Sequence, residues 1–173
     1  MRKIALPYSK EILKHFKNPK NLGRMKNSDA IGEAGNPMCG DVMRIYIKVK
    51  KDSKGKLRIS DVKGEVFGCI VAVANTSMLT TMVKGKSFEE ALKIDKEDLI
   101  KKLGGKKKIP PIKLHCSILA LDALHEAIYN YYKAKGLPIP KELEERHKLI
   151  QKTLEDIEKR HKEFVKIERK ILE

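Results

Sequence analysis

The stretch that most constrains the fold is the apolar run from Ile70 to Val83. Read as a helix, it is apolar almost all round, so it presents no polar face to solvent. Such a helix is stable only where other parts of the chain enclose it. Gly85 follows shortly after the run, at a place where helices commonly end. The sequence therefore predicts a buried central helix.

The residues before this helix are predicted to form a sheet. Residues 42–49 are rich in β-branched and aromatic side chains and alternate in part between apolar and polar, as a half-buried strand does. A turn at 51–55 leads to two further β segments, 57–59 and 62–67. We expect these three strands to form an antiparallel meander. Residues 20–38 hold many turn formers and few apolar residues, so they are predicted to be an irregular loop.

The remaining elements of the body are predicted to be helices. Apolar residues recur at helical spacing over 8–16 and again over about 114–135. Two short helices are expected between these, one opened by the capping-box pattern at 87–90 and one beginning at 95–98. The predicted class is therefore α+β: a three-stranded antiparallel sheet packed against helices, plus a long C-terminal helix.

Residues 138–173 are predicted to form a charged helical extension to a domain that spans 1–137. Apolar residues recur every seven positions, but three of the four intervening seam positions are polar, which makes a poor coiled-coil dimer. These positions are His147, Leu154, His161 and Glu168. We expect the helix to dock on the domain or on a partner rather than to stand free in solvent. The apolar seam positions are Leu143, Ile150, Ile157, Phe164 and Ile171.

Composition and cysteine content indicate a reducing, intracellular setting. The chain of 173 residues has no apolar run long enough to span a membrane, and its first seven residues lack the apolar core of a secretory signal. Its three cysteines, an odd number, argue against a disulfide framework. We therefore expect a soluble cytoplasmic protein with reduced thiols and no membrane partner.

The formal net charge of +15 raises the question of a nucleic-acid partner. Residues 141–173 hold ten Lys and Arg against nine Asp and Glu, so almost all the excess lies in the preceding part of the chain. There the basic residues are dispersed, with few aromatics among them and no known nucleic-acid-binding motif. The pattern favours a solvated basic surface over a nucleic-acid site.

A turn at Gly35–Asp41 places a thiol and a carboxylate two positions apart, directly before the first predicted strand. Gly, Asn and Pro favour a turn, and Gly40 allows positive φ between Cys39 and Asp41, so both side chains can face one point. A lone cysteine in such a turn is more often inert than functional. Its role depends on partners elsewhere in the chain.

The other two cysteines also lie where predicted elements meet. Cys69 lies between a strand and the central helix, and Cys116 follows His115 at a helix start. We expect such positions to keep the thiols near the surface and a helix N-terminus to favour the thiolate. Three thiolates with a carboxylate or an imidazole suit zinc or a small iron–sulfur cluster. Spacing alone leaves a second interpretation open, in which the cysteines are small buried apolar residues.

At these residues the chain resembles the IscU/NifU N-terminal-domain family of iron–sulfur cluster assembly scaffolds. The resemblance covers about residues 8–135 and rests on four stretches, which together are highly specific. These are Tyr8-Ser9-Lys10 through Asn18-Pro19-Lys20-Asn21-Leu22-Gly23, Asn36–Asp41, Phe67-Gly68-Cys69, and Pro110–Ala120 with Asp122-Ala123.

The resemblance implies an α+β fold that gathers the three cysteines at one end. It implies that Cys39, Cys69 and Cys116 hold a transient [2Fe-2S] cluster or a zinc ion, with Asp41 or His115 completing the shell. Sulfur would come from a cysteine desulfurase of the IscS/NifS type, with Cys116 as the persulfide acceptor, and the cluster would pass to apo iron–sulfur proteins. The implied role is that of a scaffold rather than an enzyme.

Two features of the resemblance leave alternatives open. Where the family usually has small residues after its second cysteine, this chain has Ile70 and Val71, which puts the flexibility of that segment in doubt. The segment Ile109–Lys113 is similar to the family's docking site for an Hsp70-type chaperone, or it serves only to shape the turn. A zinc-dependent sulfurtransferase that uses the same cysteines is the alternative function, and His115 argues against it.

Overall fold

The computed structural model describes the backbone of residues 8–37 and 39–172 and the side chains of that range up to residue 163. Met38 and the first seven residues lie outside the described part. The elements in chain order are α1 (Lys10–Lys17), β1 (Ala30–Gly35), β2 (Val42–Lys51), β3 (Leu57–Phe67), α2 (Ile70–Val83), α3 (Phe88–Leu92), α4 (Lys96–Lys102), the 3₁₀ turns η1 (Lys106–Lys108) and η2 (Pro111–Lys113), α5 (His115–Ala134) and α6 (Lys141–Leu172).

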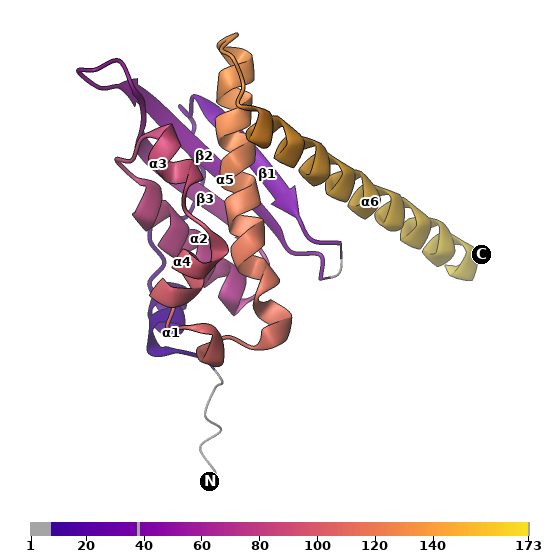
Figure 1. Cartoon of the computed structure of the whole chain (residues 1–173). Helices are drawn as coiled ribbons and strands as arrows, with labels where there is room; N and C mark the ends of the chain where they lie inside the picture. The colour runs from indigo at the N-terminus through magenta and orange to yellow at the C-terminus, as the bar shows by residue number, and fades with distance from the viewer. Residues whose placement is uncertain (1–7, 38, 173) are drawn as a thin grey trace.

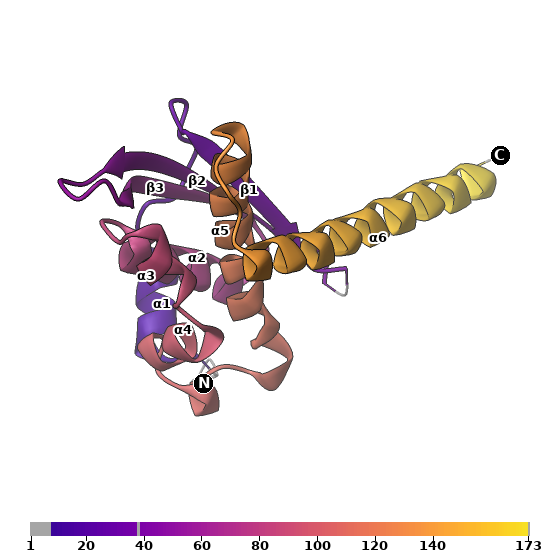
Figure 2. The same cartoon turned by 45° about the horizontal axis from the view of Figure 1, so that its top comes forward.

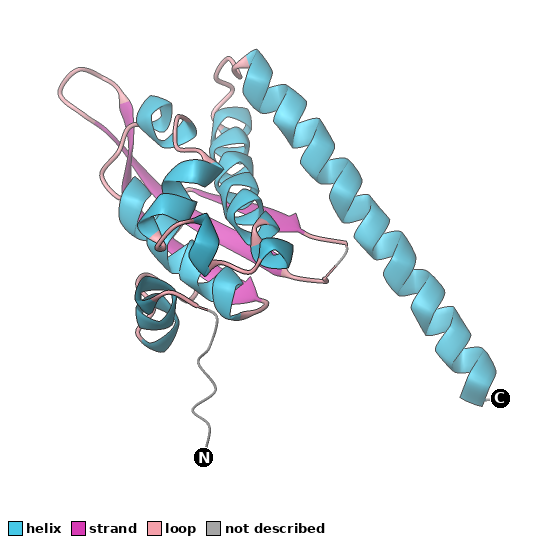
Figure 3. Cartoon of the chain, turned by 60° about the horizontal axis from the view of Figure 1, so that its bottom comes forward, coloured by secondary structure: helices cyan, strands magenta, loops and turns pink. Residues whose placement is uncertain are grey.

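The sheet is antiparallel with the strand order β1-β2-β3, and helices cover one of its faces (Figure 1). Figure 3 shows helices lying across the strands on that face, where α2 contacts β3 and α5 contacts β1 and β2. Met43, Ile45 and Ile47 alternate along β2 and are fully buried beneath these helices. The predicted α+β class is confirmed.

The first strand was not expected, because residues 20–38 were predicted to be a loop. β1 has the sequence AIGEAG, whose small residues carry no β signal. Their small size has a packing reason: a Cβ on Gly32 would lie 2.1 Å from the backbone nitrogen of Ala127 in α5. The loop prediction is wrong for Ala30–Gly35, because close packing against α5 requires small residues there and strand propensity does not reveal this.

The two β segments predicted at 57–59 and 62–67 are one strand, β3. The register shifts between Lys48 and Val49 of β2, which pair with Asp61 and Ile59. Ser60 is the extra residue of this bulge, and its hydroxyl donates to the carbonyl of Lys48 over 3.1 Å. The bulge accounts for the interruption in the apolar pattern that suggested two strands.

The central helix α2 is buried as predicted. Val71, Leu79 and Val83 are fully buried in it. Its buried polar groups have partners: the amide nitrogen of Asn75 donates to the carbonyl of Val71 over 2.9 Å, and Asn75 accepts from the hydroxyl of Ser117 over 2.8 Å. These bonds join α2 to α5, which runs beside it through the core.

The last helix, α6, docks on α5 and β1 and then extends past the body of the molecule (Figure 2). Leu143 and Ile150 of the predicted seam are buried, and Ile157 is half-buried. The prediction of a docked helix is confirmed for this part. The side chains of Phe164 and Ile171 lie outside the described residues.

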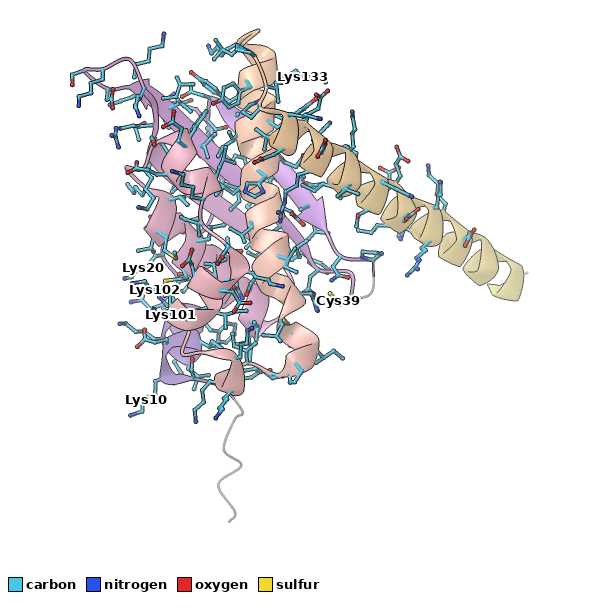
Figure 4. All side chains as sticks on the ribbon, viewed as in Figure 1. Lys10, Lys20, Cys39, Lys101, Lys102 and Lys133 are labelled. Atoms are coloured by element: carbon cyan, nitrogen blue, oxygen red, sulfur yellow. The ribbon has the colours of Figure 1, made fainter. Side chains whose placement is uncertain are left out.

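In the described part of the chain, every helix is too short or too polar to cross a membrane. In the view of Figure 4, Lys133 lies at one end of the molecule, whereas Lys10, Lys20, Lys101 and Lys102 lie toward the other end. The cytoplasmic location, the absence of a nucleic-acid partner and the division into 1–137 and 138–173 remain predictions.

Candidate metal centre

One end of the sheet brings two cysteine-bearing segments together. Gly35 of β1 pairs with Val42 of β2, which pairs with Phe67 of β3. The β1–β2 loop, which carries Cys39 and Asp41, is therefore next to the segment that leaves β3 toward α2. Because antiparallel pairing places the ends of neighbouring strands side by side, residues far apart in the sequence meet here.

The β1–β2 loop is closed by its own backbone. The N–H of Asn36 donates to the carbonyl of Asp41 over 2.9 Å, and the N–H of Gly40 donates to the carbonyl of Asn36 over 2.8 Å. Gly40 has φ of +73°, a conformation that favours glycine. The predicted role of Gly40, a positive φ between Cys39 and Asp41, is confirmed.

Asp41 lies at the base of this loop and is only 7% exposed. Gly68, just after β3, makes room for it: a Cβ at Gly68 would lie 2.9 Å from the carboxyl carbon of Asp41 and 3.0 Å from the Cβ of Ala72. The β1–β2 loop therefore packs against the β3–α2 junction through the contact of the Asp41 carboxylate with Gly68.

Cys69 and Cys116 begin two neighbouring helices. Cys69 is the N-cap of α2, and Cys116 is the second residue of α5. Their sulfur atoms lie 3.9 Å apart, and the Cys116 sulfur is also 3.9 Å from Oδ2 of Asp41. The thiols are free, with Cys69 half-buried and Cys116 completely buried. The expectation that each thiol stays near the surface is wrong for Cys116.

His115 joins the remaining cysteine to this group. Its Nε2 lies 3.3 Å from the sulfur of Cys39 and 3.7 Å from the sulfur of Cys116. Potential ligand atoms form two overlapping sets within 4.8 Å, one of Cys39, Asp41 and His115 and one of Asp41, Cys69 and Cys116. All five predicted site residues are therefore gathered in one place, with Cys39 on the exposed side.

The thiols of Cys39 and Cys116 favour their neutral form in the absence of a cation. Burial, followed by the neighbouring Cys69, raises the pKa of Cys116 well above its usual range. Burial also raises the pKa of Cys39, and Asp41 adds to the effect by its charge. The expected stabilisation of a Cys116 thiolate by the helix start is outweighed by burial. A bound cation would reverse this balance, because it favours thiolates.

Lys113 is the residue of this site that the sequence did not indicate. The charge of Cys69 is the largest cause that raises the pKa of the Lys113 ammonium, and Asp41 and Cys116 also contribute. A lysine placed among thiols and a carboxylate offsets their negative charge. Lys113 is the last residue of the segment Ile109–Lys113, for which the sequence predicted only chaperone docking or a role in shaping the turn.

The donor atoms suit a soft metal ion or a small iron–sulfur cluster. Three sulfurs, one imidazole nitrogen and one carboxylate converge from three separate elements, so the fold, rather than a short motif, builds the set. Thiolates with one harder donor are typical ligands of zinc and of [2Fe-2S] clusters. The interpretation of three unrelated buried cysteines does not explain why Asp41 and His115 join them.

Comparison with known proteins assigns the family. The family model described as the NifU-like N terminal domain matches residues 7–137, about three quarters of the chain. The chain belongs to the NifU-like N-terminal domain family. This membership confirms the resemblance on which the five site residues were predicted.

Members of the NifU-like family from distant organisms are similar over most of their length. The iron–sulfur cluster assembly scaffold protein IscU 1 of Archaeoglobus fulgidus is 46% identical over 148 residues, covering 82% of this chain and 92% of that protein. The scaffold protein IscU of Aquifex aeolicus is 41% identical over 133 residues, covering 77% and 81%.

A solved structure also resembles this member of the NifU-like family. The putative iron–sulfur cluster assembly scaffold protein for the SUF system from Fervidobacterium islandicum superposes with a TM-score of 0.57 at 26% identity. The match covers 70% of this chain and 96% of that one. The helix α6 lies beyond the residues that the family model matches.

Proposed function

We propose that this protein is a scaffold for iron–sulfur cluster assembly that holds a labile [2Fe-2S] cluster as cargo and passes it to apo acceptor proteins. The observation that carries the proposal is the convergence of three free thiols with Asp41 and His115 at one partly exposed site. Relatives that share more than 40% of their residues with this chain are named as scaffolds for this process. The chain holds and transfers its cargo and is not itself a catalyst.

The five donors have different roles in this proposal. Cys69 and Cys116 provide the fixed inner ligands, because each is anchored at a helix start. Cys39 provides the outer one, on the exposed loop. Asp41 or His115 completes the set, and Asp41 supplies the exchangeable oxygen ligand that allows release. In the cluster-free protein the same donors would hold zinc.

Sulfur would arrive as a persulfide from a cysteine desulfurase. The Cys116 sulfur attacks the terminal sulfur of the donor persulfide and forms a new S–S bond, while the S–S bond of the donor breaks. The proton of the Cys116 thiol passes to the departing donor sulfur, so the donor leaves as a thiol. The exchange itself involves no net oxidation. An external electron donor then supplies two electrons for each sulfur that enters a cluster as sulfide. Because Cys116 is buried, the donor persulfide can reach it only if the site opens, whereas Cys39 is already exposed to solvent.

The segment Ile109–Lys113 offers a surface for an Hsp70-type chaperone. Ile109 is buried and anchors the segment, whereas Ile112 is 76% exposed between Pro111 and Lys113. An exposed apolar side chain on a proline-stiffened segment suits binding to a peptide groove. The contact with the body through Ile109 leaves Ile112 available to a partner.

Anaerobic reconstitution with iron, cysteine and a desulfurase tests the proposed function. We expect the visible absorption of a [2Fe-2S] cluster, and we expect it to be lost in Cys69→Ser. A control is Ser53→Ala, which removes an exposed hydroxyl in the turn between β2 and β3 and leaves every thiol in place. A protein that yields no chromophore, keeps tight zinc and stimulates the desulfurase would instead be the zinc-dependent sulfurtransferase.

A further inference from the structure

The first half of α6 is fixed on α5 by partly buried polar contacts. Arg146 donates to Asp122 over 2.8 Å. Glu126, which is 2% exposed, lies 2.8 Å from Nδ1 of His147 and accepts from the amide of Gln151 over 2.7 Å. Because Glu126 is buried and the partners are matched in position, sliding or rotating α6 would leave its carboxylate unpaired. The register of α6 on the body is therefore well defined.

The following turns of α6 reach the end of β1. Gly35, the last residue of that strand, faces α6 so closely that a Cβ there would lie 2.6 Å from Cδ1 of Ile157 and 3.3 Å from Cδ2 of Leu154. Both of these apolar side chains are half-buried. The absence of a side chain at Gly35 thus allows α6 to pack against the start of the β1–β2 loop.

One turn further along, α6 contacts the loop itself. Nη1 of Arg160 donates to the carbonyl of Pro37 over 3.1 Å. Pro37 is two residues before Cys39, whose sulfur lies 3.3 Å from His115. Figures 1 and 2 both show α6 running past this loop. A hydrogen bond from a rigid helix to a loop carbonyl limits how far that part of the loop moves.

We propose that α6 is a built-in brace for the Cys39 loop, and that Arg160 is a positioning residue for the outermost thiol of the metal centre. Its consequence for cargo rests on the proposed function. When the brace is intact, Cys39 stays near His115 and retains its cargo. When the brace is loosened, the Cys39 loop moves away from His115 more often, and the bound metal or cluster is lost faster. The brace lies beyond residue 137, where the match to the family model ends.

Amide hydrogen exchange on the metal-free full-length protein tests the brace without any cluster. We expect Arg160→Ala to speed hydrogen exchange at the Gly40 and Asn36 amides by about 3- to 10-fold. This is the effect expected from the loss of one hydrogen bond. Amides in α2 and the unfolding midpoint should stay unchanged. Lys159→Ala is the matched control, since it removes a neighbouring exposed positive charge. Arg160→Lys, which keeps a donor, should restore part of the protection.

The same variants then test the effect on the cargo. We expect zinc, measured by transfer to a chelator, to leave Arg160→Ala and Ile157→Ala faster than it leaves Lys159→Ala. Unchanged exchange in the loop of Arg160→Ala would overturn the brace. Faster exchange with unchanged zinc loss would overturn the link between the brace and Cys39. A wild-type protein that binds neither zinc nor a cluster would refute the proposed function while the exchange result still stands.

Discussion

The carboxylate of Asp41 packs against Gly68 so tightly that a single methyl group between them would lie 2.9 Å from the carboxyl carbon. These two residues belong to the two loops that carry Cys39 and Cys69. Their contact sets how the exposed loop sits over the buried thiols. The geometry of the site therefore depends on a residue that provides no ligand.

Replacing Gly68 by Ala should weaken metal binding. The added methyl would displace Asp41 or Ala72, and overpacking of this kind typically costs about 1–3 kcal/mol. We expect zinc affinity to fall roughly tenfold or more, as measured by competition with a chromogenic chelator. In an Asp41→Ala background the same change should cost less, because one of its two close contacts is gone. Equal losses in both backgrounds would show that Gly68 does not act through Asp41.

Replacing Asp41 by Ala should trap a more stable cluster. An oxygen donor is the hardest of the five ligands and the most easily exchanged for water, so its removal leaves the thiolates and His115 as ligands. We expect the visible absorption of the reconstituted cluster to decay several-fold more slowly than in the wild type. Asp156→Ala, which removes an exposed carboxylate of α6, is the control. Decay as fast as in the wild type would remove Asp41 from this role.

The protein should lose stability in acid through His125. This side chain is 7% exposed between α5 and α6, and within the described residues neither of its ring nitrogens has a hydrogen-bond partner. Burial, followed by the charge of Arg146, lowers its pKa to about 4. The unfolded state therefore takes up a proton at a higher pH than the folded state does. Stability is retained above pH 6.5 and is lost as the pH falls toward 4, by about 3 kcal/mol at most.

A comparison with His125→Leu isolates this effect. Burial raises the pKa values of Asp122 and Glu126, so these carboxyls bind protons more readily in the folded state and oppose the trend. Denaturant unfolding at a series of pH values should show a steeper loss in the wild type than in the variant between pH 6.5 and 4. Parallel curves would show that His125 does not cause the loss.

The docking of α6 should depend on Ile150 and not on its neighbour Leu149. Ile150 is 5% exposed, whereas Leu149 is 68% exposed. Truncating Ile150 to Ala should lower the free energy of unfolding by about 2–4 kcal/mol, and Leu149→Ala should change it by less than about 0.5 kcal/mol. Urea denaturation of the two full-length variants measures the difference. Similar values for the two would mean that α6 does not contribute to the folded body.

The sequence predicted elements wherever local pattern and burial agree. The all-round apolar character of α2 predicted its burial, and the capping residues Ser87 and Asp95 predicted α3 and α4. β1 was not predicted, because its residues are small. Their size is required by the close packing of α5 against Gly32. Strand propensity carries no information about such a tertiary demand.

For the site, the ligand types could be predicted but their environments could not. The five donors were identified by residue type, position and family resemblance. Burial of Cys116 depends on packing that no local pattern shows. The same is true of the contact between Arg160 and Pro37, which are 123 positions apart. The helix start was predicted to favour the thiolate of Cys116. That prediction is wrong, because desolvation has the larger effect on the pKa of Cys116 and raises it.

Transfer of a cluster to an acceptor bears on the scaffold role more closely than binding does. The loaded protein would be mixed anaerobically with an apo [2Fe-2S] ferredoxin and excess iron chelator, and the acceptor's spectrum followed by circular dichroism. We expect the ferredoxin to gain its cluster despite the chelator, and to gain it more slowly from Asp41→Ala. Iron that appears on the chelator, with no cluster on the ferredoxin, would contradict a scaffold that hands its cargo on intact.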